Sequence, residues 1–329
     1  MSLLTTFTEE KFHPHHIQRF TPDQHLEGLA TLIERSFGKE LARTQNAMVR
    51  EMRQMARWGL MLRLAHAIKP FPMGYVWMEK GKVVGNVNLS TESGDVWRLS
   101  NVAVLPSFRG RGIAGHLVDR AIEYARRHKA RYLVLEVSPD NTIALSLYRH
   151  RGFKTFETLH ELYLSPASWP LFLHPLKEDV RAVRASDSPQ LHRLMLSSLS
   201  AEHRQRFPVR ACAFRRGFWQ KILQYVSAAF KDELIFELVG ECGQSIVAYG
   251  RLTASLFHGP HDLEIHVRPD QRGQWELELA KGLLWSLRSL PRSKVRARIA
   301  SHHPEAIEAL EALGFESVRV LKQMSLEIH

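Results

Sequence analysis

The sequence predicts an α/β (α+β) fold arranged as two tandem domains of one kind. The chain has 329 residues, which favours two domains at roughly 100–200 residues each. Short apolar segments alternate with amphipathic helical segments, and the second half repeats the order of the first. With 44% hydrophobic and 24% charged residues, the composition is that of a globular protein, which excludes a disordered or collagen-like chain.

The first half alternates strands and helices. Leu26, Leu29, Leu32 and Ile33 recur at helical spacing, and a second, methionine-rich helical stretch ends before Pro70. Residues 79–81 form a turn-like sequence between two alternating segments, which predicts a hairpin. The expected strands are His16–Phe20, Tyr75–Met78, Lys82–Leu89, Trp97–Leu105, Tyr132–Val137 and Lys154–Leu164. The expected helices are Asp23–Phe37, Glu40–Ile68, Ile113–His128 and Thr142–His150.

Two segments of the first half recur later in the same order. The run Val104–Gly110 matches Val267–Gly273 without gaps, and Leu147–Phe153 matches Ala309–Phe315. Both matches are separated by nearly the same length of chain, which indicates a duplicated domain rather than a solenoid. We therefore expect a first domain at residues 1–168, a proline-marked linker at 169–178 and a second domain at 179–329.

Composition also restricts the class of protein. No apolar run reaches the roughly 18 residues of a membrane span, and residues 1–11 lack an apolar stretch of signal-peptide length. The two cysteines, Cys212 and Cys242, exclude a disulfide framework and a multi-cysteine zinc site. We expect a cytoplasmic enzyme or binding protein with no membrane partner. The net charge of +11 is compatible with a plain basic protein or with a polyanionic partner.

A glycine-rich turn carries the chemical signal. Residues 109–112, Arg-Gly-Arg-Gly, follow a predicted strand and open the predicted helix at Ile113. The first turn of a helix leaves N–H groups unpaired, and the helix dipole favours negative charge there. Glycines let a phosphate approach the backbone closely. The turn is therefore a candidate diphosphate site.

Two other phosphate-binding motifs fit less well. The chain lacks the Gly-x-x-x-x-Gly-Lys-Ser/Thr pattern of a Walker loop. Gly110, Gly112 and Gly115 do have the spacing of the dinucleotide fingerprint. That motif, however, belongs to an early βαβ unit with an acidic residue about 20 positions on, whereas this turn follows a hairpin. The spacing of the glycines leaves a dinucleotide-binding fold open, but the surrounding sequence fits such a fold poorly.

The turn resembles a known family motif. Asn101-Val-Ala-Val-Leu-Pro-Ser-Phe-Arg109-Gly-Arg-Gly-Ile-Ala114 is similar to the acetyl-CoA pyrophosphate loop of the GCN5-related N-acetyltransferase (GNAT) superfamily. A second segment, from Leu135 through Asn141 and Tyr148 to Phe153, resembles the other hallmark of that family. The resemblance covers about residues 15–165 and, more weakly, the second copy. It implies that each domain has a mixed, mostly antiparallel central sheet flanked by helices.

The resemblance also implies roles for individual residues. Backbone groups of Val102, Ala103 and Val104 would contact the pantetheine arm, and Asn141 would contact it or orient the following helix. Tyr148 would be the general acid for the departing thiolate, and Glu136 the best candidate base, as in ribosomal-protein alanine N-acetyltransferases. The residues expected to hold the pyrophosphate are Arg109, Gly110, Arg111, Gly112, Ile113 and Ala114.

Structural roles for the same residues compete with these functional ones. Glu136 could pair with an arginine, Tyr148 could be a core tyrosine, and Asn141 could be only a helix N-cap. Arg109 and Arg111 could be solvated charges. In the second copy Trp275 and Leu277 stand where Gly112 and Ala114 stand in the first, and Leu310 stands in place of Tyr148, so we expect that copy to be non-catalytic.

Other candidate ligands have weaker support. A metal is not expected, because the histidines at 13, 15 and 16 and at 302–303 are typical of surface positions. The aromatic residues do not interleave with a basic stripe, which disfavours nucleic acid. The methionines of residues 40–68 are expected to pack in the core and could line an acceptor pocket.

The functional expectation is an acetyl-CoA-dependent N-acetyltransferase without a metal. Its acceptor would be a primary amine: a protein N-terminus, a lysine or a small molecule. One alternative is a non-catalytic acyl-CoA-binding sensor or scaffold, and another is an enzyme similar to mycothiol synthases. Mycothiol synthases use their C-terminal copy, which is degenerate here. A homodimer could form.

Overall fold

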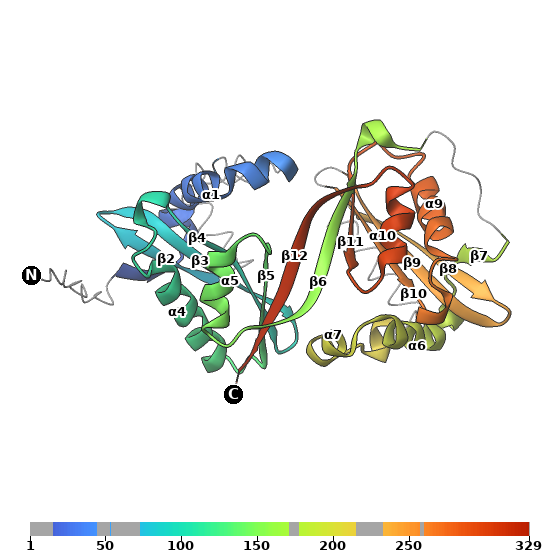
Figure 1. Cartoon of the computed structure of the whole chain (residues 1–329), viewed down its shortest axis with the longest axis horizontal. Coiled ribbons are helices and arrows are strands. Elements are labelled where there is room, and N and C mark those ends of the chain that lie inside the picture. The colour runs from blue at the N-terminus through green and yellow to red at the C-terminus, as the bar shows by residue number, and fades with distance from the viewer. Residues whose placement is uncertain are drawn as a thin grey trace, which may run out of the picture. The chain divides into compact units, whose positions relative to one another are not determined.

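The computed structural model describes residues 16–44, 53, 73–170, 178–214, 233–256 and 260–328. The chain forms two compact units, Met1–Leu135 with Glu327–His329, and Glu136–Leu326. Figure 1 labels their helices and strands. Among the described helices, none is both long enough and apolar enough to cross a membrane.

The first unit is built on a sheet in the order β1-β2-β3-β4-β5. The first three pairings are antiparallel and β4 pairs with β5 in parallel. Its strands are β1 (Ile17–Arg19), β2 (Met73–Glu79), β3 (Lys82–Ser93), β4 (Val96–Val104) and β5 (Tyr132–Val137), whose last two residues belong to the second unit. Its helices are α1 (Pro22–Thr44) and α4 (Ile113–Arg127), with a 3₁₀ turn at Pro106–Phe108.

Helices α1 and α4 cover opposite faces of this sheet (Figure 1). Val76 of β2 belongs to the apolar cluster that includes Leu29 and Leu32 of α1. The ring of the next residue, Trp77, lies against His116 of α4 with centroids 5.9 Å apart. Because successive strand residues point to opposite faces, the two helices pack on opposite sides. Helices thus cover both faces of the sheet, and the turn before α4 lies beyond the end of β4.

In the part of the second unit that the structure describes, the strands follow the order β12-β6-β11-β10-β9-β8-β7. The pairing of β10 with β11 is parallel and the others are antiparallel. The strands are β6 (Lys154–Leu164), β7 (Val180–Ala182), β8 (Glu233–Cys242), β9 (Ser245–Ser255), β10 (His261–Val267), β11 (Val295–Ala300) and β12 (Glu316–Glu327). The described helices are α5 (Thr142–Arg149), α6 (Ser188–Ser198), α7 (Ala201–Arg206), α9 (Glu276–Ser286) and α10 (Pro304–Glu311). Further 3₁₀ turns lie at Pro166–Ser168, Ala185–Asp187, Ala211–Phe214 and Pro269–Gln271.

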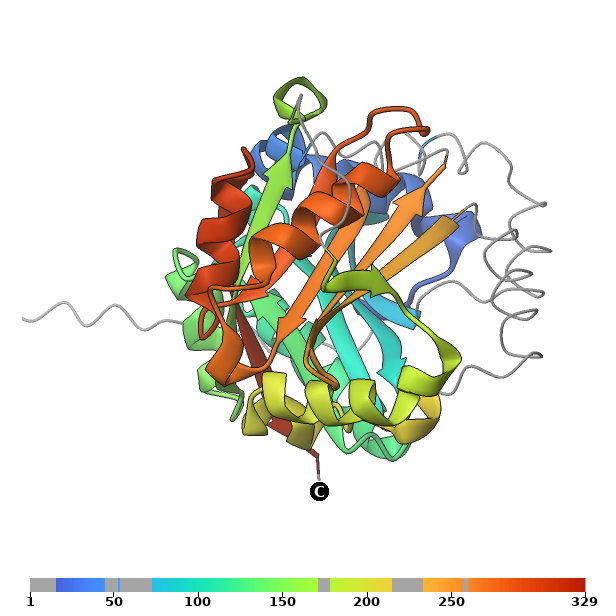
Figure 2. The ribbon, with the colours of Figure 1, turned by 90° about the vertical axis from the view of Figure 1, so that its right-hand side faces the viewer.

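Helix α9 crosses strands β8 to β10 on one face of this unit (Figure 2). Leu279 and Leu283 of α9 share an apolar cluster with Leu238, whereas the neighbouring Val239 packs with Leu191 of α6. The two faces of the sheet are therefore covered by different helices. The mixed, mostly antiparallel sheets flanked by helices confirm the expected fold class.

The order of elements supports the duplication seen in the sequence. The series β1, α1, β2, β3, β4, α4, β5, α5, β6 corresponds to β7, α6, β8, β9, β10, α9, β11, α10, β12. The last strand of each repeat pairs with the last strand of the other, and Leu159 lies opposite Leu321, its own counterpart in the second repeat. When equivalent positions of two repeats lie opposite each other, the two strands are related locally by a two-fold axis.

The compact units divide the chain differently from the repeat boundaries expected at residues 169–178. Strand β6, which ends the first repeat in sequence, lies between β11 and β12 and so belongs to the second unit. Trp169, at the start of the expected linker, is buried in the apolar cluster of that unit. Its indole N–H donates to the Ser293 carbonyl at 3.2 Å. The repeat boundaries themselves stay a prediction from sequence.

One expected helix boundary is wrong. We expected a helix to end at Phe37 and another to begin at Glu40, but α1 continues through this segment to Thr44. A single glycine at position 38 costs a helix only about 1 kcal/mol, which does not force a break. The rest of the methionine-rich stretch lies outside the described residues, apart from residue 53.

Candidate active site

The glycine-rich turn leads from β4 into α4 as the sequence predicts. Gly110 and Gly112 have φ of 78° and 74°, the left-handed region that favours glycine. Gly112 is the N-cap of α4 without a side-chain capping bond, and the N–H of His116 makes the bond to the Gly112 carbonyl at 3.1 Å. The N–H groups of residues 112–115 precede that bond, so the helix itself does not use them. This is the donor arrangement that a phosphate group requires.

The space around the turn is also suited to a bulky anion. A Cβ placed on Gly110 would meet no atom within 4 Å. Arg109 is exposed and its Nε donates to the Val104 carbonyl at 3.1 Å. Arg111 is exposed as well, and its guanidinium lies 4.9 Å from the centre of the Phe108 ring and 3.9 Å from Glu79 Oε1. Both arginines add positive potential, while the backbone supplies the directed donors.

Strand β4 carries an irregularity just before the turn. Its register with β3 shifts between Asn86 and Asn88, and Asn101 on β4 has a φ of 52°. The buried Asn86 amide donates to the Asn101 carbonyl at 3.0 Å and to Asn88 Oδ1 at 3.1 Å. We did not predict this contact, although asparagine is uncommon within strands and is enriched in the left-handed region.

The parallel register between β4 and β5 covers only the first part of β4. It joins residues 96–98 to residues 132–134. Residues 102–104 lie beyond this register, on the part of β4 that leads into the turn, with Ala103 opposite Asn86 and Val104 opposite Gly85 of β3. The backbone N–H and C=O groups of residues 102–104 that point away from β3 are therefore not used by the pairing of β4 with β5.

Tyr148 and Asn141 belong to the α5 segment of the second unit. Tyr148 is 6% exposed, and its ring meets Phe153 edge-on with centroids 5.7 Å apart. Burial raises the pKa of the Tyr148 hydroxyl to about 12. Asn141 is the N-cap of α5, and its Oδ1 accepts from the Ala144 N–H at 3.1 Å. The N-cap role considered from the sequence is therefore present.

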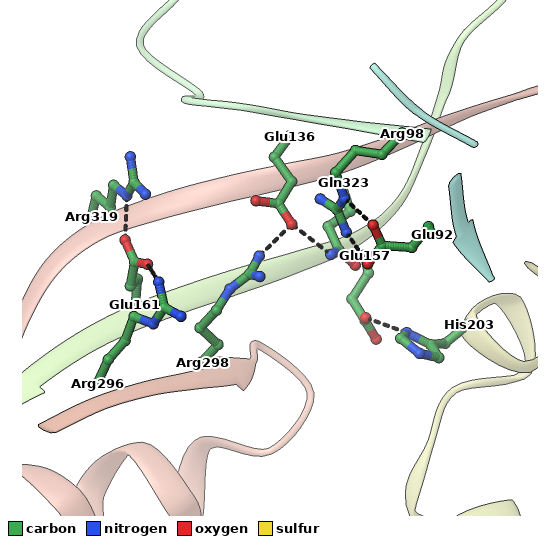
Figure 3. A network of polar contacts seen from close by, with 10 residues as sticks. All are labelled: Glu92, Arg98, Glu136, Glu157, Glu161, His203, Arg296, Arg298, Arg319 and Gln323. Atoms are coloured by element: carbon green, nitrogen blue, oxygen red, sulfur yellow. Dashed lines mark hydrogen bonds and ion pairs between the residues drawn. The ribbon is translucent and has the colours of Figure 1, made fainter. Parts of the chain in front are cut away.

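Glu136 near the end of β5 is held by two side chains of the second repeat (Figure 3). Its carboxylate accepts from the Arg298 guanidinium of β11 and from the Gln323 amide of β12, the latter at 3.0 Å. The pairing with an arginine, considered from the sequence as the alternative to a base, is present. Arg298 is the counterpart of Glu136 in the second repeat, so two equivalent positions of the repeats pair with each other.

Comparison with known families identifies this architecture. Residues 33–153 match the model of the acetyltransferase (GNAT) family. The chain contains a GNAT domain. That match includes the β4–α4 turn and the α5 segment with Asn141 and Tyr148, the two regions on which the sequence resemblance rested.

Individual relatives point the same way. The chain is similar to an uncharacterized N-acetyltransferase of Methanocaldococcus jannaschii, 34% identical over 91 residues, covering 26% of this chain and 40% of the relative. It is 31% identical over 67 residues to N-alpha-acetyltransferase 30 of Schizosaccharomyces pombe, covering 20% and 45%. The chain thus spans less than half the length of both relatives. A tandem GNAT protein from the clavulanic acid biosynthesis pathway shares the fold, with a TM-score of 0.53, 18% identity and coverage of 78% and 83%.

The turn of the second repeat differs from that of the GNAT domain in one decisive way. The Glu276 carboxylate, 1% exposed, accepts from the N–H groups of Gly273 at 2.9 Å and Trp275 at 3.2 Å. His303 Nε2 contacts its other oxygen at 2.8 Å. The chain's own carboxylate therefore occupies the position where the helix α9 would receive an anion. The sequence reasoning missed Glu276, although an acidic residue in the first turn of a helix is favoured by the helix dipole.

Trp275 itself points into the core. A Cβ on Gly240 of β8 would lie 2.4 Å from the Trp275 ring, so the indole packs directly on that strand. Trp275 has a φ of −118°, whereas its counterpart Gly112 has a φ of 74°. Leu310, the counterpart of Tyr148, is fully buried, and its aliphatic side chain cannot donate a proton. The anion position of the second repeat is thus filled by the Glu276 carboxylate, while the indole of Trp275 packs on β8.

The histidines do not form a metal centre in the part of the chain that the structure describes, where no group of three or more His, Cys, Asp or Glu side chains could hold an ion. His16 stacks on Trp77 with ring centroids 5.5 Å apart. The surface position expected for His303 is wrong, because its side chain is buried against Glu276. The expected histidines at 13 and 15 lie outside the described residues.

Proposed function

We propose that this protein is an acetyl-CoA-dependent N-acetyltransferase that transfers an acetyl group directly to a primary amine. The observation that carries the proposal is the β4–α4 turn, where two left-handed glycines and the unused N–H groups of residues 112–115 form a diphosphate cradle. The match of residues 33–153 to the GNAT family supports the same conclusion.

The residues of the turn fit the cofactor expected from the family. Arg109 to Ala114 would hold the pyrophosphate through backbone N–H groups, with the two arginines adding charge. Val102, Ala103 and Val104 would offer backbone groups to the pantetheine arm, because they lie beyond the β4–β5 register. Asn141 caps α5 through Oδ1, so its side-chain NH2 group would be the one to contact the arm. When bound, acetyl-CoA supplies an activated thioester.

The proposed proton transfers use Glu136 and Tyr148. The acceptor ammonium loses a proton to Glu136, directly or through water, and its nitrogen then attacks the thioester carbon. As the carbon–sulfur bond breaks, the Tyr148 hydroxyl protonates the leaving thiolate. The raised pKa of Tyr148 keeps that hydroxyl protonated at neutral pH, as an acid requires. The Arg298 guanidinium pairs with the Glu136 carboxylate, so the proposed base lies beside a fixed positive charge.

One observation favours a second candidate, a non-catalytic acyl-CoA-binding sensor. Glu136 is already engaged by Arg298 and Gln323, so its contacts would also suit a purely structural carboxylate. The sensor would bind acetyl-CoA through the same turn without turnover. The similarity to an N-alpha-acetyltransferase favours the enzyme, and a protein N-terminus as its acceptor.

The test separates binding from turnover. Calorimetric titration of the full chain with acetyl-CoA measures binding, and mass spectrometry of reactions with peptides bearing free N-termini, lysine and small amines measures transfer. Acetylated product that is lost in Tyr148→Phe would support the enzyme. Binding without product from any amine would support the sensor, and absence of binding would refute both.

A further inference from the structure

Acidic and basic side chains at the junction of β6, β12 and β11 are divided between the two repeats (Figure 3). The acids Glu136, Glu157 and Glu161 come from the first repeat. Their counterparts in the second repeat are Arg298, Arg319 and Gln323. Since β6 and β12 pair around Leu159 and Leu321, two identical repeats would place acid against acid here. The divergence of the two copies instead places Arg298 against Glu136 and Arg319 against Glu161.

Two of these three acids are matched by arginines. Glu136 pairs with Arg298, and Glu161, whose side chain is 2% exposed, pairs with Arg319 and lies 3.9 Å from Arg296. These are the contacts expected for carboxylates buried between strands, because a buried charge is stable only when it is paired.

Glu157 has a different environment. Its cross-strand neighbour on β12 is Gln323, whose amide donates to Glu136 instead. The Glu157 carboxylate contacts His203 Nδ1 at 2.8 Å and accepts from the Ser200 hydroxyl at 3.3 Å, with His302 Nδ1 at 3.8 Å. Its side chain is only 5% exposed. A buried carboxylate has thus been left with two imidazoles and a hydroxyl, groups that carry no fixed positive charge.

This carboxylate faces a cavity of about 380 Å³. The wall combines Glu157 and Phe156 of β6, the α7 N-cap Ser200 and Glu202 of α7, and Ser301 and His302 before α10. Two carboxylates and several hydroxyls make the wall rich in hydrogen-bond acceptors and negative in charge, and the volume suits a small group. A primary ammonium, with one positive charge and three N–H donors, is the complement of this wall.

We propose that this cavity binds the protonated amine of the acceptor, with Glu157 as its charge partner and Ser200 and His302 as further contacts. Gln323 connects it to the proposed base, because it lies opposite Glu157 in the register and donates to Glu136, so all three side chains share one face of the sheet. The assignment of the bound amine as the acetyl acceptor rests on the proposed function, whereas the binding itself does not.

Binding is tested without acetyl-CoA, by saturation-transfer NMR and calorimetry on the full chain with n-butylamine hydrochloride and, as the neutral analogue, n-butanol. We expect the wild type to bind butylamine in preference to butanol, and Glu157→Gln to weaken butylamine binding at least about tenfold. Glu311→Gln removes an exposed acid of α10 that does not line the cavity, and should bind as the wild type does. Equal butylamine affinity in the wild type and Glu157→Gln would overturn the proposal.

A second variant covers the case in which Glu157→Gln does not fold. Ser301 is exposed at the cavity wall, so Ser301→Phe should block the cavity and abolish butylamine binding while the melting temperature stays unchanged. Undiminished binding in Ser301→Phe would overturn the proposal. Binding that depends on Glu157, in a protein that acetylates no amine, would refute the proposed function and leave this site standing.

Discussion

Removal of the Glu276 carboxylate should reveal how the second repeat closes its own anion site. In Glu276→Ala, the N–H groups of Gly273 and Trp275 and the ring of His303 lose their acceptor. A buried donor without a partner costs about 1–3 kcal/mol, and solvent that reaches the turn reduces this. For the three donors together we expect unfolding free energy to fall by about 3–5 kcal/mol, the range for one-sided removal of a buried pair.

Urea unfolding followed by tryptophan fluorescence measures this loss. The matched control is Glu278→Ala in the same first turn of α9, where the carboxylate contacts Lys281 Nζ at 3.2 Å and is partly exposed. We expect the control to cost less than about 1 kcal/mol. Equal destabilisation by the two variants would refute the reasoning that Glu276 caps the helix and fills the anion position.

The same contact predicts a pH dependence. Burial alone would raise the pKa of Glu276, but the hydrogen bonds from His303 and from backbone N–H groups outweigh it and hold that pKa below the ordinary value of 4.5. A lowered pKa gives stability that is present above the ordinary value and is lost as pH falls through the folded value. The difference in stability between the wild type and Glu276→Ala should therefore shrink below about pH 4.5.

Three further variants test other parts of the structure. Tyr148→Phe should lower kcat by about 10²–10⁴-fold, and the wild-type rate should show no loss from Tyr148 ionisation until the pH nears about 12; an unchanged rate would contradict the acid role. Asn86→Leu removes the bond to the Asn101 carbonyl and should cost about 1–3 kcal/mol, measured by thermal melting. Arg319→Leu leaves the buried Glu161 with Arg296 alone and should cost about 2 kcal/mol in urea unfolding; no loss would show that the pair is not stabilising.

Local features of the sequence predicted the elements that carry the site. The strands β5 at Tyr132–Val137 and β6 at Lys154–Leu164 have the expected bounds. The first is an apolar segment, whereas the second mixes polar and apolar residues and begins just after Gly152. The start of α4 at Ile113 follows from the glycines before it. Each of these patterns is confined to a few neighbouring residues, so a single sequence is sufficient to predict the element.

Contacts between distant strands could not be predicted in the same way. The pairing of β6 with β12 joins the ends of the two repeats, which lie far apart in the chain, and no local pattern indicates which strand completes which sheet. The Glu136–Arg298 pair depends on that topology, so sequence could offer an arginine partner only as an alternative. The Glu276 contacts were readable only in part, because an acidic residue in the first turn of a helix is favoured by the helix dipole but does not reveal its partners.

We propose that one repeat holds acetyl-CoA and the other does not. Calorimetric titration of the full chain should give one acetyl-CoA per chain. Gly112→Val, which forces a branched side chain into a left-handed position of the turn, should abolish binding. Gly243→Val, at a similar φ of 62° in the β8–β9 turn, controls for strain alone and should bind normally. A stoichiometry of zero or two, or unchanged binding in Gly112→Val, would contradict the account.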